Sequence, residues 1–95
     1  MKNISNEIKQ DIKILLQKQI LKLNDIDFSP YGWISSTKII MSYISTLDTN
    51  LYNYYTSARI ELESILIFES MSRQSRDEYV KKWGKDILTT LIDII

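Results

Sequence analysis

The acidic side chains in the middle of the chain are the first candidates for chemistry. Glu61, Glu63 and Glu69 form the densest acidic group in the sequence. Two carboxylates act together as acid and base only when they face one reacting group. Residues two apart on a helix point in different directions, so Glu61 and Glu63 cannot form such a pair. Glu69 has a simpler partner in Arg73, four residues later. We therefore predict no catalytic carboxylate pair.

A second acidic stretch, Asp25 and Asp27, has the spacing that opens a calcium-binding loop. Such a loop also needs further oxygen ligands, a central glycine and a terminal glutamate. Ser29, Pro30 and Gly32 occupy this region instead. We therefore expect no metal ion and no other cofactor.

The chain has no histidine and no cysteine. Histidine is the commonest general base near neutral pH, and cysteine supplies thiolate nucleophiles, soft metal ligands and disulfides. No glycine-rich phosphate-binding loop is present either, and a serine or threonine nucleophile would lack a histidine base. The sequence therefore predicts a protein that is not an enzyme.

The composition indicates which elements position the remaining side chains. The chain has 95 residues, with two glycines and one proline. An all-β fold of this size needs many tight turns, and tight turns draw on these two residue types. Their scarcity favours helices joined by short loops, in a single domain.

Charge and hydropathy limit the expected surroundings. Twelve basic side chains balance twelve acidic ones, so no overall field attracts nucleic acid or an anionic membrane. No apolar run is long enough to span a bilayer, and the N-terminus lacks the apolar stretch of a signal peptide. We expect a cytoplasmic protein. Heavy use of Ile, Lys, Asn and Tyr, whose codons are AT-rich, suggests a bacterial or phage origin.

The spacing of apolar residues predicts four helices, roughly over residues 5–24, 30–47, 50–72 and 76–94. Ser29 followed by Pro30 is a favourable start for the second helix. Ser75 and Glu78 have the spacing of a capping box, which would begin the fourth helix. Gly84 costs that helix about 1 kcal/mol relative to alanine, but we expect it to continue unbroken. The predicted fold is an all-α, single-domain, up-down four-helix bundle.

Three tyrosines open the third predicted helix. At about 100° per residue, Tyr54 and Tyr55 lie on the arc that faces the bundle, while Tyr52 lies at its margin. Packing at the edge of the core is the simpler interpretation. The alternative is an aromatic platform that contacts a partner protein.

The third helix carries a second apolar stripe that a small monomer does not need. Ile60, Ile67 and Met71 lie nearly opposite the core arc, with Phe68 beside them. These residues either pack between neighbouring helices or contact another chain. A four-helix bundle has no central helix, so the second interpretation is favoured.

The first helix repeats this pattern, with Ile14 and Leu21 seven residues apart and away from its core face. An extended exposed apolar patch usually marks an interface. We therefore predict a partner-binding set formed by both stripes and their neighbours: Ile14, Leu21, Tyr52, Ile60, Glu63, Ile67, Phe68 and Met71.

The charged residues are unevenly distributed along the chain. The first helix is basic, residues 24–70 are net acidic, and Lys81, Lys82 and Lys85 form a second basic group. Ordinary solvated faces are the simpler interpretation. A charge-complementary docking surface is the alternative, and its acidic part would suit a basic toxin or a nucleic-acid enzyme.

These features predict a small non-catalytic protein that binds another protein. An inhibitor or self-protection protein, of the immunity, antitoxin or anti-defence kind, would act by occluding its partner. One alternative is a homo-oligomeric scaffold, for example a homodimer, and a second is a helical protein that binds nucleic acid through its lysines. The C-terminal ILTTLIDII could lie on a membrane surface. It packs equally well as the last helix, so we do not expect membrane binding.

Overall fold

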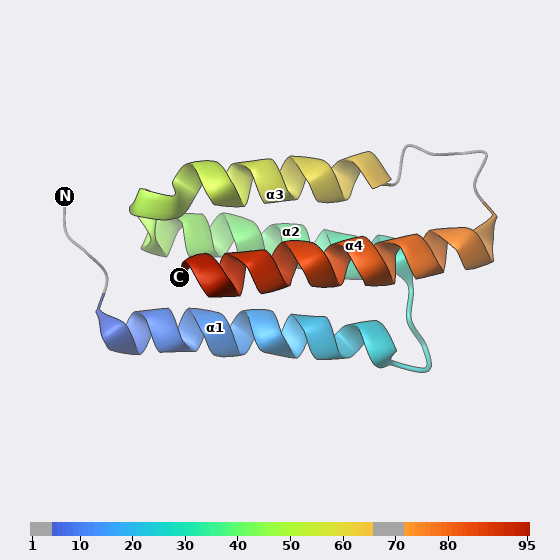
Figure 1. Ribbon diagram of the computed structural model, residues 1–95, viewed down its shortest axis with the longest axis horizontal. Helices are drawn as coiled ribbons and strands as arrows, with labels where there is room; N and C mark the ends of the chain where they lie inside the picture. Colours follow the sequence, from blue (N-terminus) through green and yellow to red (C-terminus); the bar gives the residue numbers. More distant parts are fainter. Residues whose placement is uncertain (1–4, 66–71) are drawn as a thin grey trace.

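Four helices run along the length of the molecule (Figure 1). The computed structural model describes residues 5–65 and 72–95. Successive helices run in opposite directions, which confirms the predicted all-α, up-down bundle. Their bounds are α1, Asn6–Leu21; α2, Pro30–Leu47; α3, Tyr52–Ile65; and α4, Arg73–Ile94.

The helices are not equally close to one another. α1 and α3 lie at opposite edges of the bundle, and α2 and α4 lie between them (Figure 1). α3 packs against both α2 and α4, and α1 packs mainly against α4. This arrangement decides which side chains can share a surface, because the outer faces of α1 and α3 point away from each other.

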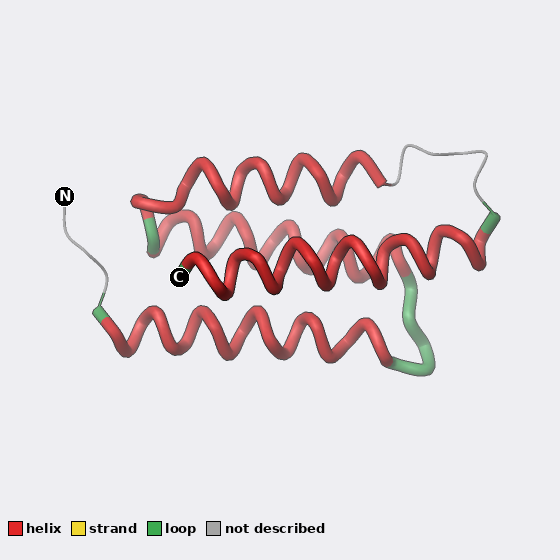
Figure 2. The backbone as a smooth tube through the Cα atoms, viewed as in Figure 1, coloured by secondary structure: helices red, strands yellow, loops and turns green. Residues whose placement is uncertain are grey.

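The first two connections follow from local sequence. α1 gives way to a 3-10 turn over Lys22–Asn24, within the predicted range of the first helix, and a longer loop then leads to α2 (Figure 2). The Ser29 hydroxyl accepts a hydrogen bond from the Gly32 N–H at 3.3 Å, with Pro30 in the first turn, as predicted. A second 3-10 turn, Thr49–Leu51, precedes α3.

The predicted start of the fourth helix is wrong by one turn. α4 begins at Arg73, and the Ser72 hydroxyl accepts a hydrogen bond from the Ser75 N–H at 3.2 Å. Ser75 therefore lies inside the helix, and Glu78 accepts from the Gln74 side chain instead of closing a capping box. Ser72 offers the same capping chemistry as Ser75, and starting there adds a turn of backbone hydrogen bonds. The predicted end of the third helix lies outside the described residues.

All four helices contribute to one core. Each large side chain removed from water contributes roughly 1.5–3 kcal/mol, which is what holds amphipathic helices of this length together. The members with almost no exposed surface are Ile12, Leu16, Ile34, Met41, Ile44, Tyr55, Leu62, Val80 and Leu88.

Trp33 joins three of the helices. Its indole N–H donates to the backbone carbonyl of Gln19 in α1 at 2.8 Å. The Gln19 side chain donates in return to the hydroxyls of Ser36 and Thr37 in α2, both at 2.8 Å. The far edge of the same indole lies against Gly84 in α4, where an added Cβ would come within 2.6 Å of Cη2. Gly84 therefore allows α4 to approach α2 closely.

Within the described residues, none of the helices combines the length and the apolar character needed to cross a membrane.

Candidate functional site

The structure divides the predicted partner-binding residues between two faces. Ile14 and Leu21 lie on α1, with 41% and 66% of their surface exposed. Tyr52 and Ile60 lie on α3, 54% and 56% exposed. Because α1 and α3 occupy opposite edges of the bundle (Figure 1), these two pairs do not form one surface.

The other four predicted partner-binding residues either form an ion pair or lie outside the described residues. The Glu63 carboxylate lies 2.9 Å from the Lys38 amine, which links α3 to α2. The hydrogen bond from Lys38 lowers the pKa of Glu63, and the charges of Lys38 and Arg59 lower it further. A partner that contacted Glu63 would have to compete with this ion pair. Ile67, Phe68 and Met71 lie outside the described residues.

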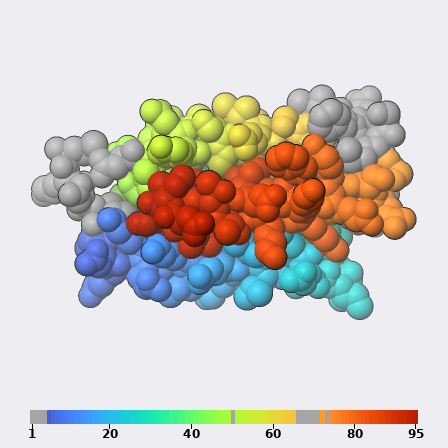
Figure 3. Space-filling view, viewed as in Figure 1, coloured from blue at the N-terminus to red at the C-terminus, as the bar shows by residue number. Residues whose placement is uncertain are grey.

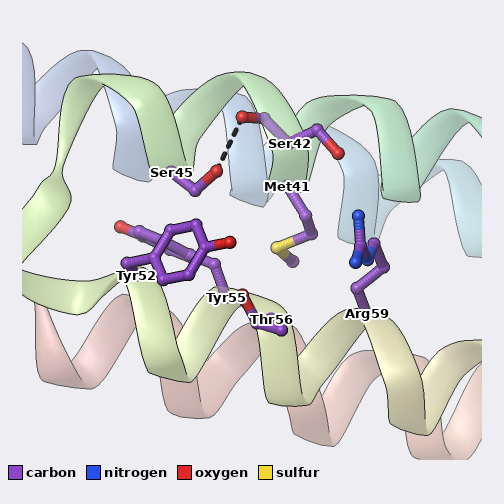
Figure 4. A pocket seen from close by; sticks show the side chains of 7 residues that line it. All are labelled: Met41, Ser42, Ser45, Tyr52, Tyr55, Thr56 and Arg59. Carbon is purple, nitrogen blue, oxygen red and sulfur yellow. Dashed lines mark hydrogen bonds between the residues drawn. The ribbon is translucent and has the colours of Figure 1, made fainter.

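A polar pocket of about 210 Å³ lies between α2 and α3 (Figure 4). Its described lining is Met41, Ser42, Ser45, Tyr52, Tyr55, Thr56 and Arg59. This set includes no carboxylate, imidazole or thiol, and the Ser45 hydroxyl donates to the Ser42 carbonyl at 2.7 Å. None of the lining hydroxyls therefore has an activating base within the set.

Tyr55 forms the inner side of this pocket. Its hydroxyl donates to the Asp48 carboxylate at 3.4 Å, and both side chains are almost completely buried. Burial raises the pKa of Tyr55, and the charge of Asp48 and its hydrogen bond raise it further. Tyr55 therefore stays neutral at physiological pH, where this pair is a structural contact.

A more apolar groove runs between α3 and α4. Figure 3 shows α4 across the front of the molecule with α3 above it, so the seam between them faces the solvent. One hollow of about 280 Å³ in this seam is lined by Tyr54, Ser57, Ala58, Glu61, Trp83, Asp86, Ile87, Thr90, Leu91 and Ile94. A second, of about 230 Å³, is lined by Glu61, Ser64, Ile65, Tyr79, Trp83 and Ile87. We call the two hollows together the α3–α4 groove.

Trp83 is the largest of the three residues, with Glu61 and Ile87, that line both hollows of the α3–α4 groove. Its side chain is 44% exposed and its ring centroid lies 5.6 Å from that of Tyr79. The α3 side of the groove includes three small residues, Ser57, Ala58 and Ser64. The indole therefore keeps a large apolar surface in contact with water.

Among the described residues, the charges that line the groove have one sign. Glu61 and Asp86 are the charged residues among its described lining, and both are exposed. Lys82 directly precedes Trp83 in the sequence but lines neither hollow. The groove thus combines an aromatic floor with an acidic rim.

The sequence interpretation missed this groove because it assigned its residues to the core. Tyr54 was expected to face the bundle but is 54% exposed. Val80, Trp83, Ile87, Leu91 and Ile94 recur at helical spacing, which predicts the core face of the fourth helix. Of these residues, Trp83 and Ile94 are 44% and 39% exposed. The buried face of α4 instead contains Val80, Gly84, Leu88 and Leu91. Gly84 was the available signal, since a glycine inside an unbroken helix often marks a close approach of another side chain.

We compared the chain with protein-family models, curated proteins and solved structures, and found no significant match.

Proposed function

We propose that this protein works by binding another protein through the α3–α4 groove and performs no chemistry itself. The most specific form of this proposal is an inhibitor or self-protection protein of the immunity, antitoxin or anti-defence kind. It would act by covering the working surface of its partner. The observation that carries the proposal is the half-exposed Trp83 at the centre of an apolar groove.

The composition of the groove supports this role. Tryptophan and tyrosine are the residues that most often dominate binding energy at protein interfaces, especially near the centre of the contact. Fully burying a large apolar side chain contributes roughly 1.5–3 kcal/mol. Trp83 and Tyr54 are 44% and 54% exposed in the free protein, so a partner that covers them gains a substantial part of this free energy. Association itself costs several kcal/mol, so the partner must also contact the walls of the groove.

Affinity capture from the source cell tests this proposal when two variants are compared. Trp83→Ser removes the groove's central anchor, and Ile60→Ser removes an isoleucine that is 56% exposed on α3 and lines neither hollow. We expect a captured protein to be lost with Trp83→Ser and kept with Ile60→Ser. We also expect the activity of that captured protein to fall when the wild-type chain is added.

Two results would contradict the proposal. Capture that survives Trp83→Ser would place the interface outside the groove. A captured protein whose activity is unchanged by binding would exclude inhibition and favour a scaffold.

A homo-oligomeric scaffold is the second candidate. The observation that favours it is the exposed apolar pair Ile14 and Leu21 on α1, away from the groove. Sedimentation equilibrium separates the two candidates: the inhibitor is expected to be a monomer when purified. A stable dimer that Leu21→Lys dissociates would favour the scaffold.

A further inference from the structure

The α3–α4 groove has a shape and a charge that together describe its occupant. We propose that it binds a basic amphipathic helix of the partner protein, with an apolar residue against Trp83 and lysine or arginine side chains beside Glu61 and Asp86. This inference rests on the proposed function and adds the chemistry of the partner. It depends on which residues line the groove and on the negative charges of Glu61 and Asp86 at its rim.

The length of the groove fits a short helical segment. Its α3 wall extends from Tyr54 to Ile65, about 16 Å at 1.5 Å per residue. That distance equals about three turns of a bound helix lying along it. Helices that dock in grooves present apolar residues at i, i+3 or i+4, and i+7, which span two turns of one face. The hollows on either side of Trp83 provide two places for such residues.

The rim selects the sign of the partner's charge. Glu61 on α3 and Asp86 on α4 stand on opposite walls, and the described lining contains no basic residue. An apolar helix with basic flanks would place opposite charges beside both walls. A helix with acidic flanks would meet like charges on both sides.

The same charges argue against a second copy of this chain. Two copies that met groove to groove would bring Glu61 and Asp86 against carboxylates of the same kind, which is unfavourable. The exposed surface around Ile14 and Leu21 in a second copy is basic through Lys18 in α1 and Lys22 in the following 3-10 turn. It offers Ile14 and Leu21 as anchors, but they are seven residues apart with the polar Gln17 between them. Such a head-to-tail contact would also extend into open chains of molecules unless its geometry closed a ring.

Synthetic peptides test the sign of the charge directly. The probes are a fluorescently labelled leucine–lysine amphipathic helical peptide and a leucine–glutamate peptide with the same apolar face. Binding is measured by fluorescence anisotropy with the full chain. We expect the lysine peptide to bind at least about tenfold more tightly than the glutamate peptide, and its affinity to fall as salt is added.

A matched pair of variants locates the effect in the groove. Glu61→Lys/Asp86→Lys reverses both rim charges. Asp25→Lys/Asp27→Lys makes the same change in net charge at two exposed residues between α1 and α2 that line neither hollow. We expect the rim variant to bind the lysine peptide about tenfold more weakly than the loop variant does. Circular dichroism of both variants confirms that the exposed substitutions leave the helices intact.

Three results would overturn the inference. The first is equal binding of the two peptides, or no binding of either. The second is an equal effect of the rim and loop variants. The third is self-association of the wild-type chain that the rim variant abolishes, because the occupant would then be a second copy. A Trp83-dependent natural partner whose binding segment is acidic would overturn this inference alone, whereas capture that survives Trp83→Ser would remove the proposed function as well.

Discussion

Replacing Gly84 with alanine changes the free energy of unfolding in two opposite ways, through the helix propensity of this position and through its packing against Trp33. In an isolated helix interior, alanine is more favourable than glycine by about 1 kcal/mol. In the bundle, the new methyl group would lie 2.6 Å from Cη2 and 2.7 Å from Cζ3 of Trp33. Both distances are far shorter than a normal carbon–carbon contact of about 3.5–4.0 Å. Either α4 or the indole must therefore move.

Moving the indole would weaken its packing and its hydrogen bond. Trp33 is 5% exposed, and its N–H is held at 2.8 Å by the Gln19 carbonyl. Extra methyl groups in well-packed cores typically cost about 1–3 kcal/mol. After subtracting the helical gain of about 1 kcal/mol, Gly84→Ala should lower the free energy of unfolding by up to about 2 kcal/mol. A loss of 1 kcal/mol corresponds to a fall of about 4–8 °C in Tm for a domain of this size.

The assay is urea unfolding followed by far-ultraviolet circular dichroism, in two backgrounds. Trp33→Phe removes the distal ring edge that faces Gly84, so it creates space for the methyl group. In that background we expect Gly84→Ala to be neutral or to stabilise by up to about 1 kcal/mol. The difference between the backgrounds measures the coupling of the two positions. A Gly84→Ala variant that is more stable than wild type, or an equal effect in both backgrounds, would refute the close approach of α4 to Trp33.

Two further predictions concern the buried polar contacts. Gln19→Leu removes the donor to the Ser36 and Thr37 hydroxyls, and we expect the free energy of unfolding to fall by about 1–3 kcal/mol in the same urea assay; an unchanged value would show that these bonds contribute nothing. For Tyr55, the raised pKa means that the unfolded chain ionises first as the pH rises above the ordinary tyrosine value of about 10, so the folded state loses stability there. We expect Tyr55→Phe to make this alkaline loss shallower by up to about 1.4 kcal/mol per pH unit, and parallel curves for the two proteins would contradict the assignment.

The elements of the fold could be predicted because their signals are local. Ser29 and Pro30 define the start of α2 through a cap and a pre-set backbone angle, and both depend on adjacent residues. The predicted start of α4 was wrong by one turn because two neighbouring local signals compete. Ser72 and Ser75 carry the same hydroxyl chemistry, and the sequence alone does not decide which of them caps the helix.

The buried face of α4 depends on a contact that is not local. Hydrophobic spacing favours the face with Trp83 and Ile94, because these residues are more apolar than Gly84. The approach of Trp33 from α2 turns the helix so that Gly84 is inside and Trp83 is at the surface. Most of the candidate site follows from this rotation, which is why the periodicity of α4 did not predict it.

The predicted apolar stripes and the groove differ in the shape of the surface they occupy. Ile14, Leu21 and Ile60 project from the outer faces of helices, where single exposed apolar side chains are common in monomeric proteins. Trp83 and Tyr54 line a hollow between two helices, where a partner side chain can be surrounded on several sides. A concave site removes more apolar surface from water per inserted side chain than a convex ridge does. The outer faces of α1 and α3 also point in opposite directions, so one short helix could not cover both. The groove is therefore the stronger candidate for the primary contact, and the α1 face would require a second molecule.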